Sequence, residues 1–314
     1  MSANLRRIFT IIVTYNGAPW IKACIESLMG STLHTEIIIV DNGSSDGTLS
    51  IIKETCKNAI ILPQADNLGF GKANNIGLTY ALKQGADTVF LLNQDARVDK
   101  NTLEALVAAS KAYLEYGVLS PVQCQWDGTQ LEYYFSRFME ASLQFYSDFV
   151  LNKPTEAIYE VPFVNAAAWL LTRHVLEQVG GFDPIFKHYG EDNNYCQRLQ
   201  YHGFKVGVVP NAYIYHDSQK RTEPLNYLFS DAYWHQEVKN LQIRYANINI
   251  PYTKKDFNTV RVHVLKLVIV NLMTLKFPKV WGYLKKYRIF EVAYGTILSS
   301  RIQNMQKGAH YLDL

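Results

Sequence analysis

Cysteine is scarce in this 314-residue chain, and the cysteines present show no pairing pattern. There are four, and no two of them share a Cys-x-x-Cys spacing. This spacing argues against a zinc ribbon and against a redox pair. Four thiols are also too few to cross-link a fold of this length with disulfides, so we expect a reducing, cytoplasmic location.

Long hydrophobic runs are also missing. The most apolar segment, residues 262–275, is interrupted by His263 and Lys266 and is too short to span a bilayer. The apolar residues after Arg7 are too few for a signal peptide, and Tyr15 follows where a small residue would be cleaved. We therefore interpret residues 8–14 as a buried first strand.

Neither an excess of charge nor a standard phosphate loop is present. A net charge of +3 is too small to make nucleic acid the expected partner. No Gly-x-Gly-x-x-Gly follows the first apolar run, and no Gly-x-x-x-x-Gly-Lys-Ser/Thr occurs anywhere. The chain is therefore neither a typical dinucleotide enzyme nor a P-loop NTPase.

What the sequence does contain is a regular alternation of buried strands and helices. The pattern predicts strands over residues 8–14, 36–40, 59–62, 88–92, 118–121, 161–164, 205–209 and 212–216. It predicts helices over residues 19–28, 48–56, 70–84, 103–113, 173–179 and 191–201. Repeated strand–helix units with short connections indicate an α/β fold with a doubly wound, mostly parallel sheet.

Polar residues follow several of these strands directly, at Tyr15-Asn16, Asp41-Asn42 and Asn93-Gln94-Asp95. Ligands of such sheets bind at the carboxyl ends of the strands. We expect one domain over residues 1–224, with a donor half (about 1–120) and an acceptor half (about 121–224). A helical, basic appendage follows over residues 225–314.

The order of the motifs closely resembles that of the family 2 glycosyltransferases, inverting enzymes of the GT-A fold, over about residues 8–220. The resemblance extends to rhamnosyltransferase-like members that build bacterial polysaccharide and O-antigen. It is carried by Val13-Thr14-Tyr15-Asn16, Val40-Asp41-Asn42-Gly43, Asn67-Leu68-Gly69-Phe70-Gly71-Lys72, Asn93-Gln94-Asp95, Gly180-Gly181-Phe182-Asp183, Gly190-Glu191-Asp192 and His216.

The resemblance implies a nucleotide-sugar donor site. Tyr15 matches the ring that stacks on the base, and Asp41 matches the carboxylate that accepts N3–H of uracil or thymine. The donor is then a UDP- or dTDP-sugar, although turn chemistry explains Asp41 about as well. The expected donor-binding residues are Thr14, Tyr15, Asn16, Asp41, Asn42, Gly69, Lys72, Asn74, Asn93, Gln94 and Asp95.

The resemblance also implies a metal cofactor, Mn²⁺ or Mg²⁺, that bridges the diphosphate. Asp95 occupies the last position of the family's Asp-x-Asp motif, but Asn93 replaces the first aspartate. His216 matches a histidine ligand of many members. Asn74 stands where many relatives carry arginine, and Lys72 is the nearest cation.

Asp192 is the expected general base, with Glu191 orienting an acceptor hydroxyl. Inverting transfer needs one carboxylate on the acceptor side. Read without the resemblance, both acids are first-turn residues that stabilise a helix dipole. Trp169, His188 and Tyr189 are expected acceptor contacts, although for Trp169 a place in the core is the favoured interpretation.

The C-terminal region alternates basic and aromatic residues after its apolar segment. Two interpretations stay open: contact with the inner face of the cell membrane, or packing on the main domain or on another subunit of a homodimer. The expected partners are therefore a nucleotide-sugar donor, a glycan or lipid-linked acceptor, and no nucleic acid.

Two other functions compete with this one. A non-catalytic nucleotide- or sugar-binding module would explain Asn93 and Asn74. A nucleotidyltransferase would need a basic loop after the first strand, but no cation occurs there before Lys22.

Overall fold

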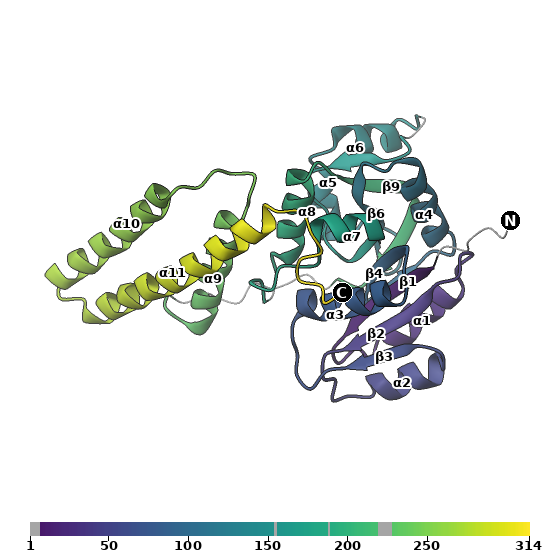
Figure 1. Cartoon of the computed structure of the whole chain (residues 1–314), viewed down its shortest axis with the longest axis horizontal. Helices are drawn as coiled ribbons and strands as arrows, with labels where there is room; N and C mark the ends of the chain where they lie inside the picture. Colours follow the sequence, from purple (N-terminus) through teal and green to yellow (C-terminus); the bar gives the residue numbers. More distant parts are fainter. Residues whose placement is uncertain (1–6, 154–155, 188, 219–227) are drawn as a thin grey trace. The chain divides into compact units, whose positions relative to one another are not determined.

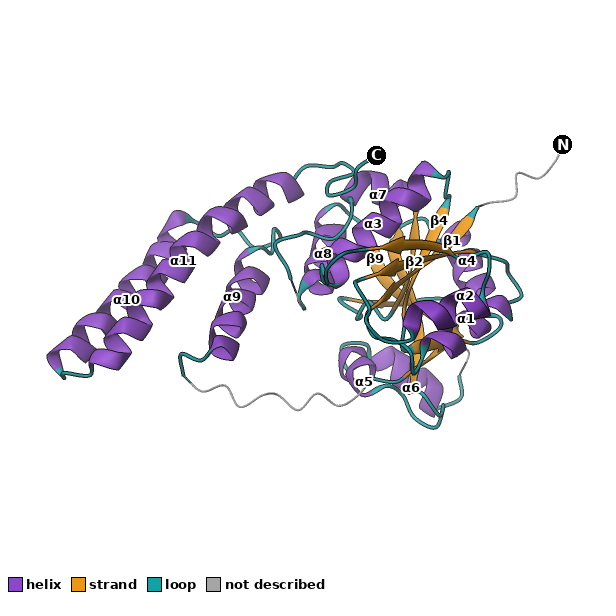
Figure 2. Cartoon of the chain, turned by 90° about the horizontal axis from the view of Figure 1, so that it is seen from below, coloured by secondary structure: helices purple, strands orange, loops and turns teal. Residues whose placement is uncertain are grey.

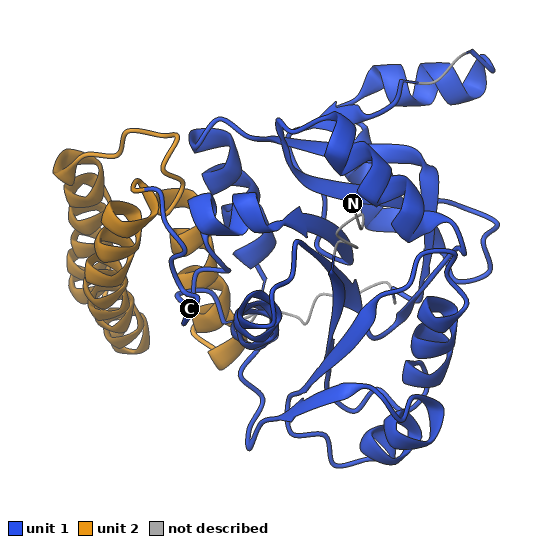
Figure 3. Ribbon diagram, turned by 45° about the vertical axis from the view of Figure 1, so that its right-hand side comes forward, with its two compact units in different colours: residues 1–220, 307–314 blue, residues 221–306 orange. Residues whose placement is uncertain are grey.

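The computed structural model describes residues 7–153, 156–187, 189–218 and 228–314. It divides into two units, which Figure 3 colours separately: unit 1 is Met1–Lys220 with Lys307–Leu314, and unit 2 is Arg221–Gln306. The expected boundary between residues 224 and 225 lies outside the described residues. The expected appendage differs in one respect, because the last eight residues belong to unit 1.

Unit 1 is built on a single mixed sheet with the order β3-β2-β1-β4-β8-β6-β9-β5, and β7 pairs with β9. The strands are β1 (Ile8–Thr14), β2 (Glu36–Asp41), β3 (Ile60–Pro63), β4 (Thr88–Asn93), β5 (Ala96–Val98), β6 (Tyr116–Gln125), β7 (Tyr159–Val161), β8 (Ala168–Thr172) and β9 (Lys205–His216). The first four are parallel to one another, which confirms the predicted α/β fold.

The helices of unit 1 cover both faces of this sheet (Figures 1 and 2). They are α1 (Ile21–Met29), α2 (Thr48–Thr55), α3 (Phe70–Lys83), α4 (Thr102–Ala112), α5 (Tyr133–Met139), α6 (Leu143–Val150), α7 (Arg173–Val179) and α8 (Glu191–Tyr201). Buried side chains of α1, α2 and α4 form one core cluster with the sheet, and those of α3, α7 and α8 form the other. The continuous apolar runs of β1 and β2 follow from this two-sided cover.

Some elements were not predicted or were placed differently. β5, β8, α5 and α6 were not expected, and the strand expected over residues 161–164 is β7, which ends at Val161. The strands expected over 205–209 and 212–216 are one strand, β9, because a register shift against β6 between Pro121 and Val122 lets the pairing continue.

The final residues return to unit 1 through main-chain contacts. Gly181 N donates to His310 O at 2.8 Å, and Gly308 N donates to Gln178 O at 2.9 Å. Leu312 packs against the core cluster of α3 and α7. A Cβ on Gly180 would lie 2.3 Å from His310 O, so this approach requires glycine.

Unit 2 is helical, with α9 (Asp231–Tyr245), α10 (Lys254–Met273) and α11 (Phe277–Asn304). Its small core contains Trp234, Tyr245, Phe257, Phe290 and Ile297. Buried Arg301 donates to the carbonyls of Tyr245 and Ile250, which ties the end of α9 to α11. Within the described residues, no helix is both long and apolar enough to cross a bilayer.

One buried amide joins α3 to the segment that leads into α8. Asn75 Nδ2 donates to Phe182 O and Asn75 Oδ1 accepts from Phe182 N, both at 2.7 Å. Removing this side chain leaves two buried main-chain groups without partners. We expect Asn75→Ala to lower the free energy of unfolding by about 1–3 kcal/mol, measured by urea unfolding. Asn58→Ala, at an exposed turn, is the control and should change it by less than about 0.5 kcal/mol. Equal stability of the two variants would contradict this role for Asn75.

Candidate active site

The carboxyl ends of β1, β2 and β4 bring the N-terminal polar residues to one edge of the sheet. Thr14 is in register with Asp41 on β2, and Val13 is in register with Asn93 on β4. Asn42 N also donates to Thr14 O at 2.8 Å. Motifs that are far apart in sequence therefore meet where a doubly wound sheet binds its ligands.

Gln94 holds the β1 end in place. Its Oε1 accepts from Thr14 Oγ1 at 2.7 Å and from Tyr15 N at 3.0 Å, and its Nε2 donates to Tyr15 O at 3.3 Å. A Cβ on Gly17 would lie 2.1 Å from Gln94 Oε1, so the glycine makes this approach possible. The middle residue of Asn93-Gln94-Asp95 thus anchors the loop that carries Tyr15, whose ring is 46% exposed.

The loop after β1 is fixed from the other side by the loop after β2. Asn16 adopts a left-handed backbone with φ 48°, its N donates to Ser44 Oγ at 2.9 Å, and its Oδ1 accepts from Ser45 N at 2.9 Å. Asn and Asp tolerate this conformation better than most residues. Ser44 and Ser45 were not among the expected site residues, although the polar turn 41–47 is the signal that marks them.

Asp41 presents one buried, unused acceptor. The residue is 2% exposed, and its Oδ2 accepts from Ser44 N at 3.1 Å. Its Oδ1 has no hydrogen-bond partner among the described residues. A buried acceptor without a partner is costly, so this oxygen is suited to receive an N–H donor from a ligand.

Asp95, in the turn just before β5, lies next to His216 at the end of β9. His216 pairs with Ala96, and its Nε2 is 3.3 Å from Asp95 Oδ1 and 3.5 Å from Asn93 Nδ2. Adjacent ligands of an octahedral Mg²⁺ or Mn²⁺ lie about 3 Å apart, so these two atoms fit neighbouring positions of one ion. Among the described residues, no group of three or more His, Cys, Asp or Glu gathers to hold a metal.

Two further groups surround this pair. Asp217 follows His216, its Oδ2 accepts from Trp20 Nε1 at 2.7 Å, and its N donates to Asp95 O at 2.9 Å. Burial, and then the negative charge of Asp95, raise the pKa of the Cys24 thiol beneath the site. Sequence reasoning missed Asp217 and Trp20, because their contact spans 197 positions of the chain.

The first turns of α3 and α8 meet at a third part of the site. A Cβ on Gly71 would lie 3.1 Å from Phe182 Cβ and 3.6 Å from Glu191 Cβ, so glycine allows this close packing. Asn42 links β2 to the start of α3 by donating through Nδ2 to Gly69 O at 3.4 Å. Lys72 is exposed on the first turn of α3.

Glu191 and Asp192 form the first turn of α8. Glu191 is 5% exposed, whereas Asp192 is half-buried and its Oδ1 accepts from Asn193 N at 2.8 Å. Tyr189 and Gly190 precede them with φ of 65° and 102°, and this turn leaves Tyr189 half exposed. A tyrosine in a left-handed conformation is strained, and such residues concentrate at binding sites.

Two expected site residues do not join these groups, and a third lies outside the described residues. Trp169 is fully buried and stacks on Phe182 at 6.0 Å between ring centroids, so the structure corrects it from an acceptor contact to a core residue. Asn74 is 1% exposed and donates to Phe70 O at 3.0 Å within its own helix. His188 lies outside the described residues.

Comparison with known proteins finds a family model and several relatives that match the chain. The family model of glycosyl transferase family 2 matches residues 10–180, more than half of the chain. The chain is similar to the N-acetylglucosaminyl-diphospho-decaprenol L-rhamnosyltransferase of Mycobacterium tuberculosis (26% identity, covering 69% of this chain and 79% of that protein). It is also similar to rhamnosyltransferase WbbL of Escherichia coli (27%; 73% and 89%) and dTDP-rhamnosyl transferase RfbF of Shigella flexneri (24%; 67% and 68%).

Solved structures share the fold. The mannosyltransferase PcManGT of Pyrobaculum calidifontis, in complex with GDP-Man and Mn²⁺, matches with a TM-score of 0.55 at 16% identity and covers 96% of this chain and 88% of that one. The TarS fragment of S. aureus in complex with UDP-GlcNAc matches with a TM-score of 0.54 at 16% identity, covering 95% and 90%. These likenesses confirm the expected GT-A fold.

Asp46 gives the loops of the site a pH dependence. It accepts from Thr48 Oγ1, from Thr48 N at 3.0 Å and from Ala18 N at 3.2 Å. These bonds lower the pKa of Asp46, and the bond from the Thr48 hydroxyl has the largest effect. A carboxyl whose folded pKa is lowered stabilises the fold above its unfolded pKa and loses that effect as the pH falls through the folded pKa.

We therefore expect Asp46→Asn to be less stable than the wild type at about pH 6, with the difference shrinking below about pH 4. Urea unfolding midpoints across this range measure it. Asp66→Asn, which removes an exposed carboxylate of a neighbouring loop, should follow the wild type at every pH. A difference between Asp46→Asn and the wild type that does not vary with pH would refute this assignment.

Proposed function

The chain belongs to glycosyl transferase family 2 and is a glycosyltransferase, and on that premise we propose that it catalyses inverting, metal-assisted transfer from a UDP- or dTDP-sugar to a hydroxyl of a glycan or lipid-linked acceptor. The pair of Asp95 and His216 carries the proposal, since its 3.3 Å separation suits one divalent ion. When bound, Mn²⁺ or Mg²⁺ supplies positive charge to the leaving diphosphate.

The donor base is recognised by Tyr15 and Asp41. The exposed Tyr15 ring offers a face for stacking. The unused Oδ1 of Asp41 accepts the N3–H that uracil and thymine both carry. The names of the three bacterial relatives support rhamnose as the sugar, and that of RfbF supports dTDP as its carrier.

Asp192 acts as the general base. Its carboxylate takes the proton of the acceptor hydroxyl while that oxygen attacks the anomeric carbon, and the bond from this carbon to the diphosphate breaks on the opposite face. The nucleoside diphosphate leaves, and the new glycosidic bond has the inverted configuration. Glu191 orients the acceptor, and Tyr189 contacts it from the strained turn before α8.

The acceptor is a glycan or a lipid-linked sugar. The name of the Mycobacterium tuberculosis relative, an N-acetylglucosaminyl-diphospho-decaprenol L-rhamnosyltransferase, supports the lipid-linked form. A second candidate function is a non-catalytic binding module. It is favoured by Asn93, whose amide replaces the first carboxylate of the metal motif. Donor hydrolysis in the absence of acceptor distinguishes the two.

The role of Asp192 is tested by Asp192→Asn, which keeps the size of the side chain and removes its basicity. We expect transfer to fall by about 10²–10⁴-fold, with unchanged binding of the nucleotide, because the base acts only on the acceptor. Product formation from dTDP-rhamnose and nucleotide titration measure the two effects. Glu177→Gln, which neutralises an exposed carboxylate of α7, is the matched control. Nucleotide binding lost while transfer persists would overturn the assignment.

Thermal shift with UDP, dTDP and GDP, with and without Mn²⁺, distinguishes the role of Asp41 from that of Asp95. A ligand that prefers the folded state raises the melting temperature. We expect UDP or dTDP, but not GDP, to stabilise the wild type, with a further increase on adding Mn²⁺. Asp95→Asn should lose only the Mn²⁺ increment, whereas Asp41→Asn should lose the preference for UDP or dTDP over GDP. Removing the metal with EDTA should make the wild type behave like Asp95→Asn. Identical behaviour of both variants would show that the two carboxylates do not have separate roles.

A further inference from the structure

The turn between α10 and α11 in unit 2 carries an unusual set of exposed apolar side chains. Met273 ends α10 and Phe277 begins α11, so only three residues connect the helices. We call the following six residues the hairpin tip, and each is more than half exposed: Ile269, Leu272, Met273, Leu275, Phe277 and Trp281. Scattered exposed apolar residues are ordinary, but a contiguous group marks an interaction surface.

Packing of the hairpin does not account for these residues. The residues of α10 that are buried, Phe257, Val264 and Asn271, recur every seven positions and form its seam. Val262, Leu265, Ile269 and Leu272 recur at helical spacing on a different face and are exposed. The helix is therefore apolar on a side that unit 2 leaves uncovered.

The turn geometry does not account for them either. Leu275 has a φ of 53° and is 72% exposed. Glycine or asparagine fits a left-handed helix end with less strain than leucine. A leucine here holds an apolar side chain outward at a conformational cost.

The charge around the tip is of one sign. Residues 257–290 contain no Asp or Glu and contain seven Lys and Arg: Arg261, Lys266, Lys276, Lys279, Lys285, Lys286 and Arg288. Within the described residues, Arg261 pairs with Glu291 and Lys286 pairs with Glu237, and the other five have no ion pair. Lys276 and Lys279 are exposed at the tip itself.

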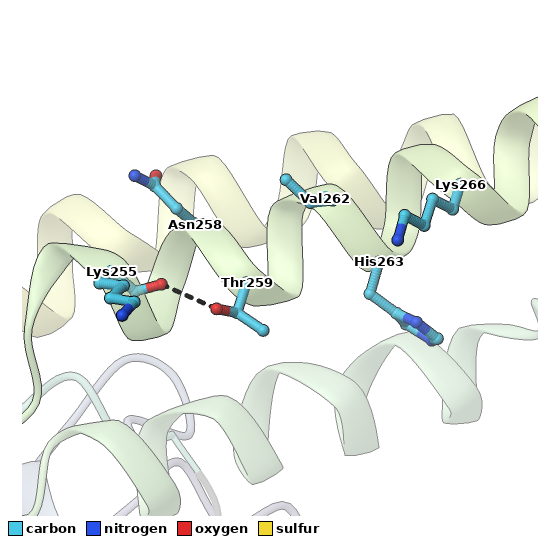
Figure 4. A pocket seen from close by; sticks show the side chains of 6 residues that line it. All are labelled: Lys255, Asn258, Thr259, Val262, His263 and Lys266. Carbon is cyan, nitrogen blue, oxygen red and sulfur yellow. Dashed lines mark hydrogen bonds between the residues drawn. The ribbon is translucent and has the colours of Figure 1, made fainter.

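The basic character continues along α10. Lys255, His263 and Lys266 line a hollow of about 400 Å³ on this helix, together with Asn258, Thr259 and Val262 (Figure 4). No carboxylate lines it. Two copies of such a surface would repel each other, whereas an anionic surface would attract it.

We infer that the hairpin tip inserts into the surface of an anionic lipid bilayer. Trp281 and Phe277 enter the interface beside the apolar residues of α10, and the lysines bind lipid phosphates. The finding that no described helix can span a bilayer agrees with contact from one side. The inference does not depend on the proposed transfer reaction, because lipid binding needs neither donor nor acceptor.

Vesicle sedimentation with the full chain tests the inference. We expect the wild type to bind phosphatidylcholine vesicles containing phosphatidylglycerol, and to bind vesicles of phosphatidylcholine alone much more weakly. Raising the salt from about 0.1 M to about 0.5 M should weaken binding to the anionic vesicles. The double variant Met273→Gln, Trp281→Gln should bind about tenfold more weakly or worse. Lys276→Glu with Lys279→Glu should lose the preference for anionic lipid.

Val292→Gln is the matched control, because Val292 is also more than half exposed on α11 but lies eleven positions beyond Trp281. It should bind vesicles as the wild type does. Quenching of tryptophan fluorescence by brominated phosphatidylglycerol gives a second measurement, which still tests the inference if the double variant misfolds. The wild type should be quenched, and Trp281→Phe, which keeps an aromatic ring, should bind vesicles but lose that quenching.

Three results would overturn the inference. The first is a wild type that does not bind anionic vesicles, and the second is a folded tip variant that binds as the wild type does. The third comes from sedimentation velocity without lipid: a wild-type dimer that the tip variant makes monomeric would show that a second copy covers the tip.

Discussion

The register of β1 with its two neighbours is the constraint on which the rest of the site depends. Strands in a parallel sheet alternate their side chains between the faces, so a slip of one residue would exchange the two cores. The observed register sets Thr14 beside Asp41 and Val13 beside Asn93. It also brings Gln94 within reach of Thr14 and Tyr15, and these bonds in turn require glycine at position 17. Strand pairing, loop shape and the exposure of Tyr15 therefore form one linked arrangement.

Strands β5, β8 and β9 position the site residues that strands β1, β2 and β4 do not carry. β9 pairs antiparallel with β5, and this pairing sets His216, at the end of β9, against Asp95 in the turn before β5. β8 continues the sheet from β4, and its Trp169 packs under Phe182, which leads toward α8. Arg198 donates to the carbonyls of Val179 and Gly181 and fixes the loop before that helix. Glu191 and Asp192 thus take their positions from buried packing, while the residues near Tyr15 take theirs from polar contacts at the surface.

The sequence alone predicts those parts of the molecule whose signals are local. The unbroken apolar run of residues 8–14 marks β1 because the strand is buried on both faces, and the glycine after residue 84 marks the end of α3. β5 and β8 were missed because they are short, and their identity depends on partners far along the chain. Asp41 and Asp95 were found through their motifs. The anchoring role of Gln94 and the contact of Trp20 with Asp217 had no sequence signal, since each joins residues roughly 80 or 200 positions apart.

The return of residues 307–314 to unit 1 changes what kind of element the helical unit is. Unit 2 is bounded on both sides by chain that belongs to the unit 1 fold, so topologically it is an insertion and not a tail. Ending the chain before α9 would remove Leu312 from its place in the core, as well as the main-chain bonds of His310 and Gly308. A form without the helices that preserves unit 1 must therefore be made by internal excision, with residue 218 or a nearby position rejoined to residue 307 through a linker. For the same reason, a tag fused after Leu314 emerges beside α3 and α7, from the unit that carries the proposed catalytic residues.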